Sequence, residues 1–138
     1  MTRPEITGKR DIDFSRWIRK NLPDSSSGFL VSDIDFYIFN YKTKNHALVE
    51  IKTYTGQLKE WQRKMYERLG RWIKEGSEKE GWNFKGFFLI KFEKKDFTEG
   101  KVYLNGIEST EEEIRRILSL EDIEEERHWS LRPIEQVL

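Results

Sequence analysis

Apolar residues recur at helical spacing in two parts of the chain. The first set predicts a helix that begins near Asp13 and ends before Pro23, with Phe14, Trp17, Ile18 and Leu22 on one face. The second set predicts a longer helix over residues 58–74, and its members are Leu58, Trp61, Met65, Leu69 and Trp72. We expect both apolar faces, with their tryptophans, to pack into a core.

Between these helices the pattern changes to strands. Residues 29–41 and 47–52 are rich in β-branched and aromatic side chains, and a polar stretch separates them, which predicts an antiparallel hairpin. Alternation along its strands puts Asp33 and Asp35 on one face. A turn centred between Thr43 and Lys44 would place Asp35 opposite the neighbourhood of Lys52.

The second half of the chain predicts further strands and helices. Residues 87–90 read as a central strand, and Val102 and Leu104 as a short edge strand. Thr110 and the glutamates after it predict the start of a helix that runs to Leu118, and an acidic helical segment is expected from near Ser119. The order of elements predicts an α/β fold with a central mixed β-sheet flanked by helices.

Length and composition narrow the class of protein. The 138 residues fit one domain, 1–138, and the absence of cysteine excludes disulfides, zinc–thiolate sites and iron–sulfur clusters. No apolar run approaches the length that crosses a bilayer, so we expect no membrane partner and a place inside the cell. Residues 1–74 carry 15 Lys and Arg against 9 Asp and Glu, whereas residues 75–138 carry 10 against 16. A basic working face is therefore compatible with zero net charge.

Acidic residues on the predicted hairpin carry the candidate chemistry. Asp33 and Asp35 are two apart on one strand, and Glu50 and Lys52 are two apart on its partner. Carboxylates are costly to bury unless a charge partner or a metal compensates them, and clustered oxygens suit Mg²⁺ or Mn²⁺. The plainer interpretation is a solvent-exposed salt bridge between Lys52 and one of the carboxylates.

These residues resemble the signature of the PD-(D/E)xK nuclease superfamily. Asp35 followed by Glu50-Ile51-Lys52 matches its acidic and lysine positions, and Gln62 with Tyr66 matches the Gln-x-x-x-Tyr element of the RecB-like branch. Ser32 and Ile34 stand where the superfamily often has proline. The resemblance implies a restriction-endonuclease-like core over about residues 11–92, and the acidic helical part, about 107–138, has no counterpart in it.

The resemblance also implies a role for each residue. Asp35 and Glu50 would hold Mg²⁺, or Mn²⁺, with the backbone carbonyl of Ile51, and Asp33 would be a second ligand or a helper. Lys52 would position the attacking water. Gln62 and Tyr66 would contact the site or the DNA backbone, although they could equally complete the edge of a helix. Three acidic residues compete for the position that relatives place on the first helix: Glu5, Asp11 and Asp13.

Basic side chains on the 58–74 helix suggest how DNA would be held. Lys59, Arg63 and Lys64 lead a basic stripe that continues through Arg68, Arg71 and Lys74. Such a stripe can neutralise phosphates. It can also serve solubility and pairs within the helix, such as Glu60 with Lys64.

The expected function is that of a metal-dependent DNA nuclease guided by DNA structure or by a partner, because the chain has little room for a sequence-reading domain. A Holliday-junction resolvase and a non-catalytic nucleic-acid-binding or assembly module on the same fold are the alternatives. Cutting both strands usually needs two sites, which favours a homodimer. The acidic C-terminal region is a candidate surface for a protein partner.

Overall fold

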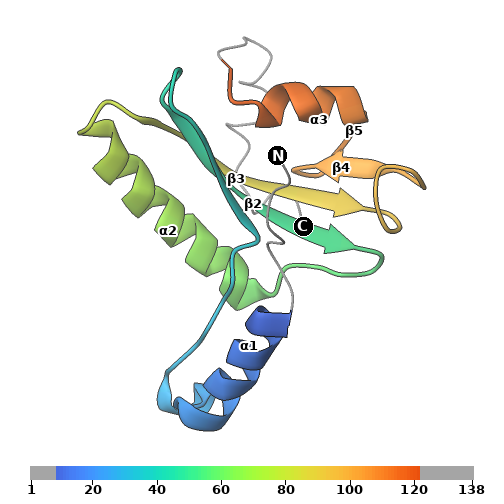
Figure 1. Cartoon of the computed structure of the whole chain (residues 1–138). Coiled ribbons are helices and arrows are strands. Elements are labelled where there is room, and N and C mark those ends of the chain that lie inside the picture. The colour runs from blue at the N-terminus through green and yellow to red at the C-terminus, as the bar shows by residue number, and fades with distance from the viewer. Residues whose placement is uncertain (1–8, 122–138) are drawn as a thin grey trace. The chain divides into compact units, whose positions relative to one another are not determined.

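The computed structural model describes residues 9–121 of the chain (Figure 1). These residues divide into two compact units, one that ends at Asp33 and one that begins at Ile34. Glu5, a candidate acidic residue of the site, lies outside the described part of the chain, and so do the residues from 122 onward. That range includes most of the expected acidic helical segment, while residues 119–121 are not helical.

The first unit consists of one helix, a short turn and extended chain. Helix α1 spans Lys9–Asn21, so it begins four residues before the predicted start. A 3-10 helix, η1 (Ser25–Ser27), follows, capped by the Asp24 carboxylate and by Gly28 at a left-handed φ of 93°. Phe14 and Trp17 stack with ring centroids 5.7 Å apart, and both rings are exposed. Their predicted burial is therefore wrong, because residues 22–33 of this unit form only the short η1 and extended chain, which leave both rings exposed.

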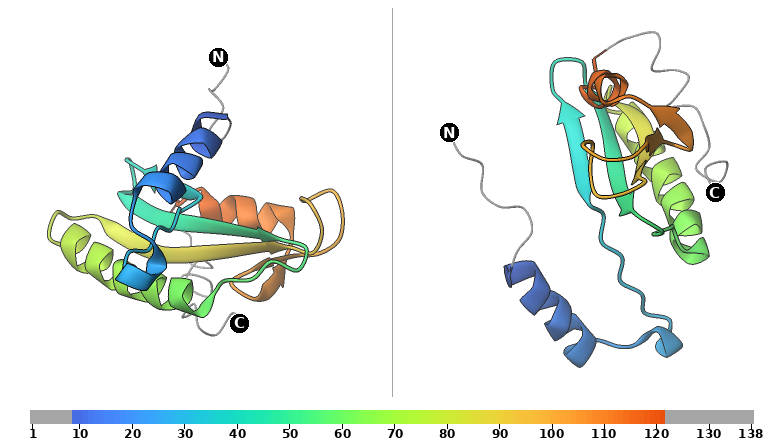
Figure 2. Two further views of the ribbon diagram at one scale, coloured as in Figure 1. Left: turned by 90° about the horizontal axis from the view of Figure 1, so that it is seen from below. Right: turned by 90° about the vertical axis from the view of Figure 1, so that its right-hand side faces the viewer.

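The second unit is built on a five-stranded sheet (Figure 2). Its strands lie in chain order: β1 (Phe36–Asn40), β2 (Asn45–Thr53), β3 (Asn83–Phe92), β4 (Val102–Leu104) and β5 (Ile107–Ser109). Neighbouring strands are antiparallel except β2 and β3, which are parallel and are joined by helix α2 (Glu60–Glu78). The predicted α/β fold with a mixed sheet is thus confirmed.

The hairpin of β1 and β2 differs from its prediction in extent and register. Strand β1 begins at Phe36 instead of Phe29, so Asp33 and Asp35 precede the strand. Asn40 pairs with Asn45 and Phe36 with Val49, which places the turn one residue earlier than expected. Asp35 therefore comes level with Glu50, two residues from the predicted position. The shift is an even number of residues, so the predicted sheet face is kept.

The two faces of the sheet pack against different helices. On one face, Ala47, Val49, Phe88 and Ile90 form a core with Ile114 and Ile117 of α3 (Glu111–Leu118). On the other face, Leu89 packs with Leu58 and with Tyr66 of α2. Figures 1 and 2 accordingly place the two helices on opposite sides of the sheet. The carboxylates of interest lie on the α2 side.

Helix α2 is longer than predicted and shows a different apolar face. It ends at Glu78, four residues beyond the expected end, and Gly70 approaches Phe84 and Phe87 of the sheet. Trp72 lies about 200° further around the helix and is 60% exposed, so its predicted burial is wrong. None of the helices in residues 9–121 combines the length and the apolarity that a membrane crossing requires.

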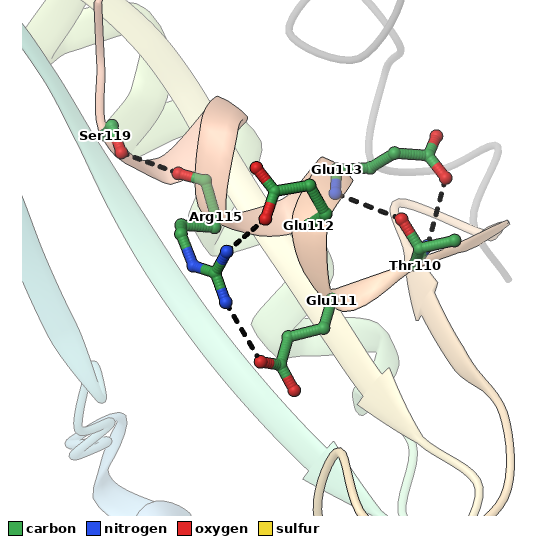
Figure 3. A network of polar contacts seen from close by, with 6 residues as sticks. All are labelled: Thr110, Glu111, Glu112, Glu113, Arg115 and Ser119. Carbon is green, nitrogen blue, oxygen red and sulfur yellow. Dashed lines mark hydrogen bonds and ion pairs between the residues drawn. The ribbon is translucent and has the colours of Figure 1, made fainter.

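Helix α3 has the predicted start and end. The Thr110 hydroxyl accepts the Glu113 backbone N–H at 3.1 Å, and the Glu113 carboxylate accepts the Thr110 N–H at 3.1 Å (Figure 3). Arg115 pairs with Glu111 and Glu112 on its exposed face. The strand before it, β5, is absent from the prediction and makes β4 an inner strand rather than the edge.

Candidate active site

Glu50 is the most unusual polar residue of the sheet. It lies in the middle of β2, on the face that α2 covers, and only 4% of its surface is exposed. One of its carboxylate oxygens, Oε2, accepts a hydrogen bond from the hydroxyl of Tyr66 at 3.1 Å. The other, Oε1, lies 3.9 Å from the Nζ atom of Lys52. This buried carboxylate therefore has the neutral Tyr66 hydroxyl on one oxygen and a lysine ammonium at 3.9 Å from the other.

Asp35 reaches the same place from the start of the hairpin. Its Oδ2 atom accepts the backbone N–H of Ile51 at 2.8 Å, one residue beyond Glu50 along β2. A side-chain oxygen thus takes the amide that a longer β1 could have bound, which is why the ladder stops at Phe36. Because the N–H and C=O of one strand residue point toward the same neighbouring strand, the Ile51 carbonyl lies on the Asp35 side of β2.

The two carboxylates repel each other. Burial raises the pKa of Glu50 to about 6, and the negative charge of Asp35 contributes to the same rise. The hydroxyl of Tyr66, the charge of Lys52 and a backbone N–H of Asp35 lower this pKa in part. The site therefore holds more negative charge than its own cations and donors balance, which is the condition that a divalent cation would relieve.

Tyr66 and Lys52 both lie beside Glu50. Tyr66 is fully buried, and its ring stacks on Phe87 of β3 with centroids 4.5 Å apart. This packing fixes the hydroxyl that meets Glu50. Lys52 is half-buried on the same face of β2 as Glu50, because the two residues are two apart in one strand.

Two of the remaining predicted residues, Gln62 and Arg63, have partners within the helix and its cap. Gln62 accepts the Lys59 backbone N–H at 3.2 Å and so caps the start of the helix. Arg63 pairs with Glu60 and, at 2.8 Å, with Glu67. Lys59 and Lys64 are exposed. Contact of Gln62, Lys59, Arg63 and Lys64 with a nucleic acid therefore stays a prediction.

The predicted helpers from the chain before β1 stay predictions as well. Asp33 is the last residue of the first unit, separate from the unit that holds Glu50. Asp13 lies on α1, exposed, with Arg16 at 3.8 Å. Asp11 lies on the same helix, one turn or less from its start.

The donor set fits a hard divalent cation in composition. Asp35 and Glu50 offer carboxylate oxygens and Ile51 a carbonyl oxygen, which are the ligand types of Mg²⁺ and Mn²⁺. Within residues 9–121, no group of three or more His, Cys, Asp and Glu side chains gathers in the manner of a complete protein-built metal site. Mg²⁺ commonly keeps several waters and takes only one or two carboxylates beside substrate phosphates, so two carboxylates and a carbonyl meet its needs.

One residue near the site was not predicted. Lys91 of β3 pairs in register with Lys52 across the parallel ladder and is half-buried. The two lysines therefore point to the same face of the sheet. The sequence does contain a signal for Lys91, because charged residues are depleted from buried strands and this lysine stands within the apolar run 87–92.

Comparisons with protein-family models, with curated proteins and with solved structures found no match.

Proposed function

We propose that the chain is a metal-dependent nuclease that hydrolyses phosphodiester bonds of DNA at the site formed by Asp35, Glu50 and Lys52. The observation that carries the proposal is the buried Glu50 carboxylate, which Asp35 repels and which meets Lys52 only at 3.9 Å. Buried like charges cost stability, and such arrangements with shifted pKa values cluster at functional sites.

An ordinary structural ion pair accounts for these observations less well. The unit contains such a pair, between Lys101 and Glu108, where both side chains are exposed and no second carboxylate contributes. Glu50 differs because it is buried and because Asp35 raises its pKa. Burial of the Glu50 carboxylate beside the half-buried Asp35, with Lys52 no closer than 3.9 Å, is hard to explain by stability alone.

The order of elements around the site supports the proposed fold. Asp35 opens a hairpin, Glu50 and Lys52 lie on its second strand, and a crossover helix carrying Tyr66 leads to a parallel strand. This arrangement is compatible with the restriction-endonuclease-like core that the PD-(D/E)xK resemblance implies. We include that fold in the proposal.

The chain's own residues define the chemistry. Asp35, Glu50 and the Ile51 carbonyl would hold the Mg²⁺, which when bound supplies an acidified water and neutralises charge on the phosphate. Lys52, beside Glu50, would orient the attacking water by donating a hydrogen bond to it. Lys91 would place a second ammonium near the phosphate oxygens, where negative charge grows as water adds and the P–O bond breaks.

A cleavage assay tests the proposal. Labelled single-stranded, duplex, flapped and four-way DNA are incubated with the protein in Mg²⁺ and in chelator. We expect cutting that depends on Mg²⁺ and falls at least about a hundredfold in Glu50→Gln and in Lys52→Ala. Glu108→Gln and Lys101→Ala remove the same charges from the exposed pair and should retain wild-type activity.

The pattern of cutting separates the related functions. We expect the enzyme to cut some of these DNA structures faster than others, since we propose guidance by DNA structure or by a partner. Symmetric cutting of the four-way junction alone would indicate a resolvase. Binding of DNA with no cutting in Mg²⁺ or Mn²⁺ would overturn the nuclease and favour the assembly module.

A further inference from the structure

Aromatic side chains continue the face of the sheet that carries the candidate site. Tyr37 and Phe39 follow Asp35 at steps of two residues, so alternation along β1 places them on the same face. Their rings stack with centroids 5.6 Å apart. Phe39 also meets Trp82, just before β3, edge to face at 6.4 Å. We refer to Tyr37, Phe39 and Trp82 as the aromatic platform.

The ring of a buried histidine, His46, packs against two members of the aromatic platform. His46 of β2 is buried, and its ring lies 5.9 Å from both Tyr37 and Trp82. Its Nδ1 atom lies 3.0 Å from the Tyr37 hydroxyl, at hydrogen-bond distance. Phe84 of β3 packs against the same ring at 5.1 Å. The platform is therefore held in a fixed geometry instead of being a set of independent surface side chains.

The outer surface of the platform is open within its unit. Tyr37 is 55% exposed and Phe39 is 58% exposed. Helix α2 packs on the β3 part of this face, where the ring of Tyr66 stacks on Phe87. Single exposed apolar residues are common on protein surfaces, but adjoining aromatic rings on one face form a patch that calls for an occupant.

We propose that the aromatic platform stacks with unpaired DNA bases and leads a single strand toward Asp35 and Glu50. This inference rests on the proposed function and names its substrate class, which is DNA with a single-stranded segment. Flat aromatic rings bind bases of any sequence through their π-faces. Bases in a duplex are already stacked and do not present these faces to a protein surface.

Position and charge favour this occupant over an apolar protein partner. The platform and the carboxylates share one strand and one face, so bases stacked on the rings would carry their phosphates past Asp35. Phe39 lies four residues from Asp35, about 13 Å along an extended strand. The exposed Lys42 and Lys44 lie in the turn at the far end of β1, where they can meet the phosphates of the incoming strand.

The test measures DNA binding in chelator, where no cutting occurs. Anisotropy of a labelled oligothymidine and of a blunt duplex is recorded for the wild type, Tyr37→Leu, Phe39→Leu and Phe39→Tyr. We expect each leucine variant to raise the Kd for oligothymidine by about fivefold or more and to leave the Kd for the duplex unchanged. Phe39→Tyr keeps an aromatic ring and should bind as the wild type does.

The matched control is Trp72→Leu, which removes an aromatic side chain of similar exposure from the outer side of α2. It should leave both Kd values unchanged. Thermal melts of all variants show whether the leucine substitutions keep the fold, and leucine retains the apolar volume while removing the ring. Phe39→Tyr provides a second comparison because it changes the same position but keeps an aromatic ring that can stack.

The outcomes separate this inference from the proposed function. Mg²⁺-dependent cutting with unchanged oligothymidine binding in both leucine variants would overturn the platform and leave the nuclease standing. Ring-dependent binding of oligothymidine without any cutting would support the platform and overturn the nuclease. Equal loss of single-strand and duplex binding, or no binding by the wild type, would overturn the platform as a single-strand site.

Discussion

Glu50 is the residue whose burial and charge set the properties of the candidate site. It is removed from water, faces a second carboxylate and meets Lys52 only at 3.9 Å. Ionised Glu50 therefore lowers the folding stability of the metal-free protein, and this loss can be measured without any DNA. We expect a change of charge at residue 50, a change of pH and the addition of a divalent cation each to alter the stability of the protein through the charge state of Glu50.

The substitution Glu50→Gln should stabilise the metal-free protein at neutral pH. Because the pKa of Glu50 is about 6 in the folded protein against 4.5 as its ordinary value, folding favours the protonated form. Its contribution to stability is fully present below pH 4.5 and is lost as the pH rises through 6. We expect Glu50→Gln to raise the free energy of unfolding by about 1–2 kcal/mol at pH 7.5. Urea unfolding measures it.

At pH 4 the same substitution should have little effect, because Glu50 is then already neutral. Glu108→Gln, at an exposed position of β5, should change the free energy of unfolding by less than about 0.5 kcal/mol at either pH. Equal stabilisation by Glu50→Gln at both pH values would contradict the assigned burial and repulsion.

Tyr66 should act on the reaction through Glu50. Its hydroxyl lowers the pKa of Glu50, so Tyr66→Phe should raise that pKa while keeping the ring stacked on Phe87. We expect the acid limb of the cleavage-rate profile to move upward by roughly half to one pH unit. Tyr41→Phe, in the exposed hairpin turn, serves as the control. A lower rate with an unmoved profile would mean that Tyr66 contributes packing alone.

At the scale of elements, the sequence predicts type better than extent. Helical spacing located α1 and α2, because apolar side chains must line one face to be buried, and the capping residues from Thr110 located α3. It could not exclude Trp72 from the core, since the sheet packs against the narrow side of α2 that includes Gly70. The strand expected from Phe29 ended up as extended chain up to Asp35, because a long β-prone run does not reveal which residues find ladder partners.

Other differences had a readable signal. Strand β5 follows the dipeptide Asn105-Gly106, whose φ angles of 48° and 82° are those of a two-residue hairpin turn. Asn-Gly between alternating apolar residues was available in the sequence as a hairpin signature. For the site, alternation along the predicted hairpin placed Asp35, Glu50 and Lys52 on one face, whereas a place for Tyr66 near them was implied only by the family resemblance. The burial of Glu50 and the presence of Lys91 depended on the parallel strand β3, which local patterns do not specify.

Glycines of α2 and of the β3–β4 loop give opposite predictions. A Cβ atom at Gly76, inside α2, would meet no atom within 4 Å, so Gly76→Ala should raise the free energy of unfolding by about 0.5–1 kcal/mol. At Gly100 the φ angle is 71° and a Cβ atom would lie 2.9 Å from the Glu93 Oε1 atom. Gly100→Ala should therefore destabilise by about 1–2 kcal/mol. Urea unfolding of both variants tests these values, and the same sign for both would contradict the described backbone.

At the scale of the whole molecule, the uneven distribution of charge along the chain indicates which part of the proposed nuclease would bind DNA. The basic excess lies in residues 1–74, which include β1, β2 and most of α2, while the acidic excess lies beyond. DNA should therefore approach the hairpin and α2. This distribution makes binding sensitive to salt, because each neutralised phosphate releases counterions.

The basic residues of α2 should differ in their contribution to that salt dependence. We expect Lys59→Ala and Lys64→Ala each to reduce the slope of log K against log salt by about 0.7–0.9, since both side chains are exposed. Arg63→Ala should change the slope much less, because its guanidinium already pairs with Glu60 and Glu67. Anisotropy titrations at several salt concentrations measure the slopes. Three equal effects would contradict this assignment.

The central claim is that Asp35 and Glu50 together bind one divalent cation, and titration of Mn²⁺ followed by its electron paramagnetic resonance signal tests it most directly. The account predicts one ion per chain at pH 7.5, weakened binding below pH 6 as Glu50 takes up its proton, and loss of the ion in both Asp35→Asn and Glu50→Gln. Glu108→Gln should bind the ion as the wild type does. Mn²⁺ binding that neither carboxylate substitution changes, or no binding at all, would contradict the account.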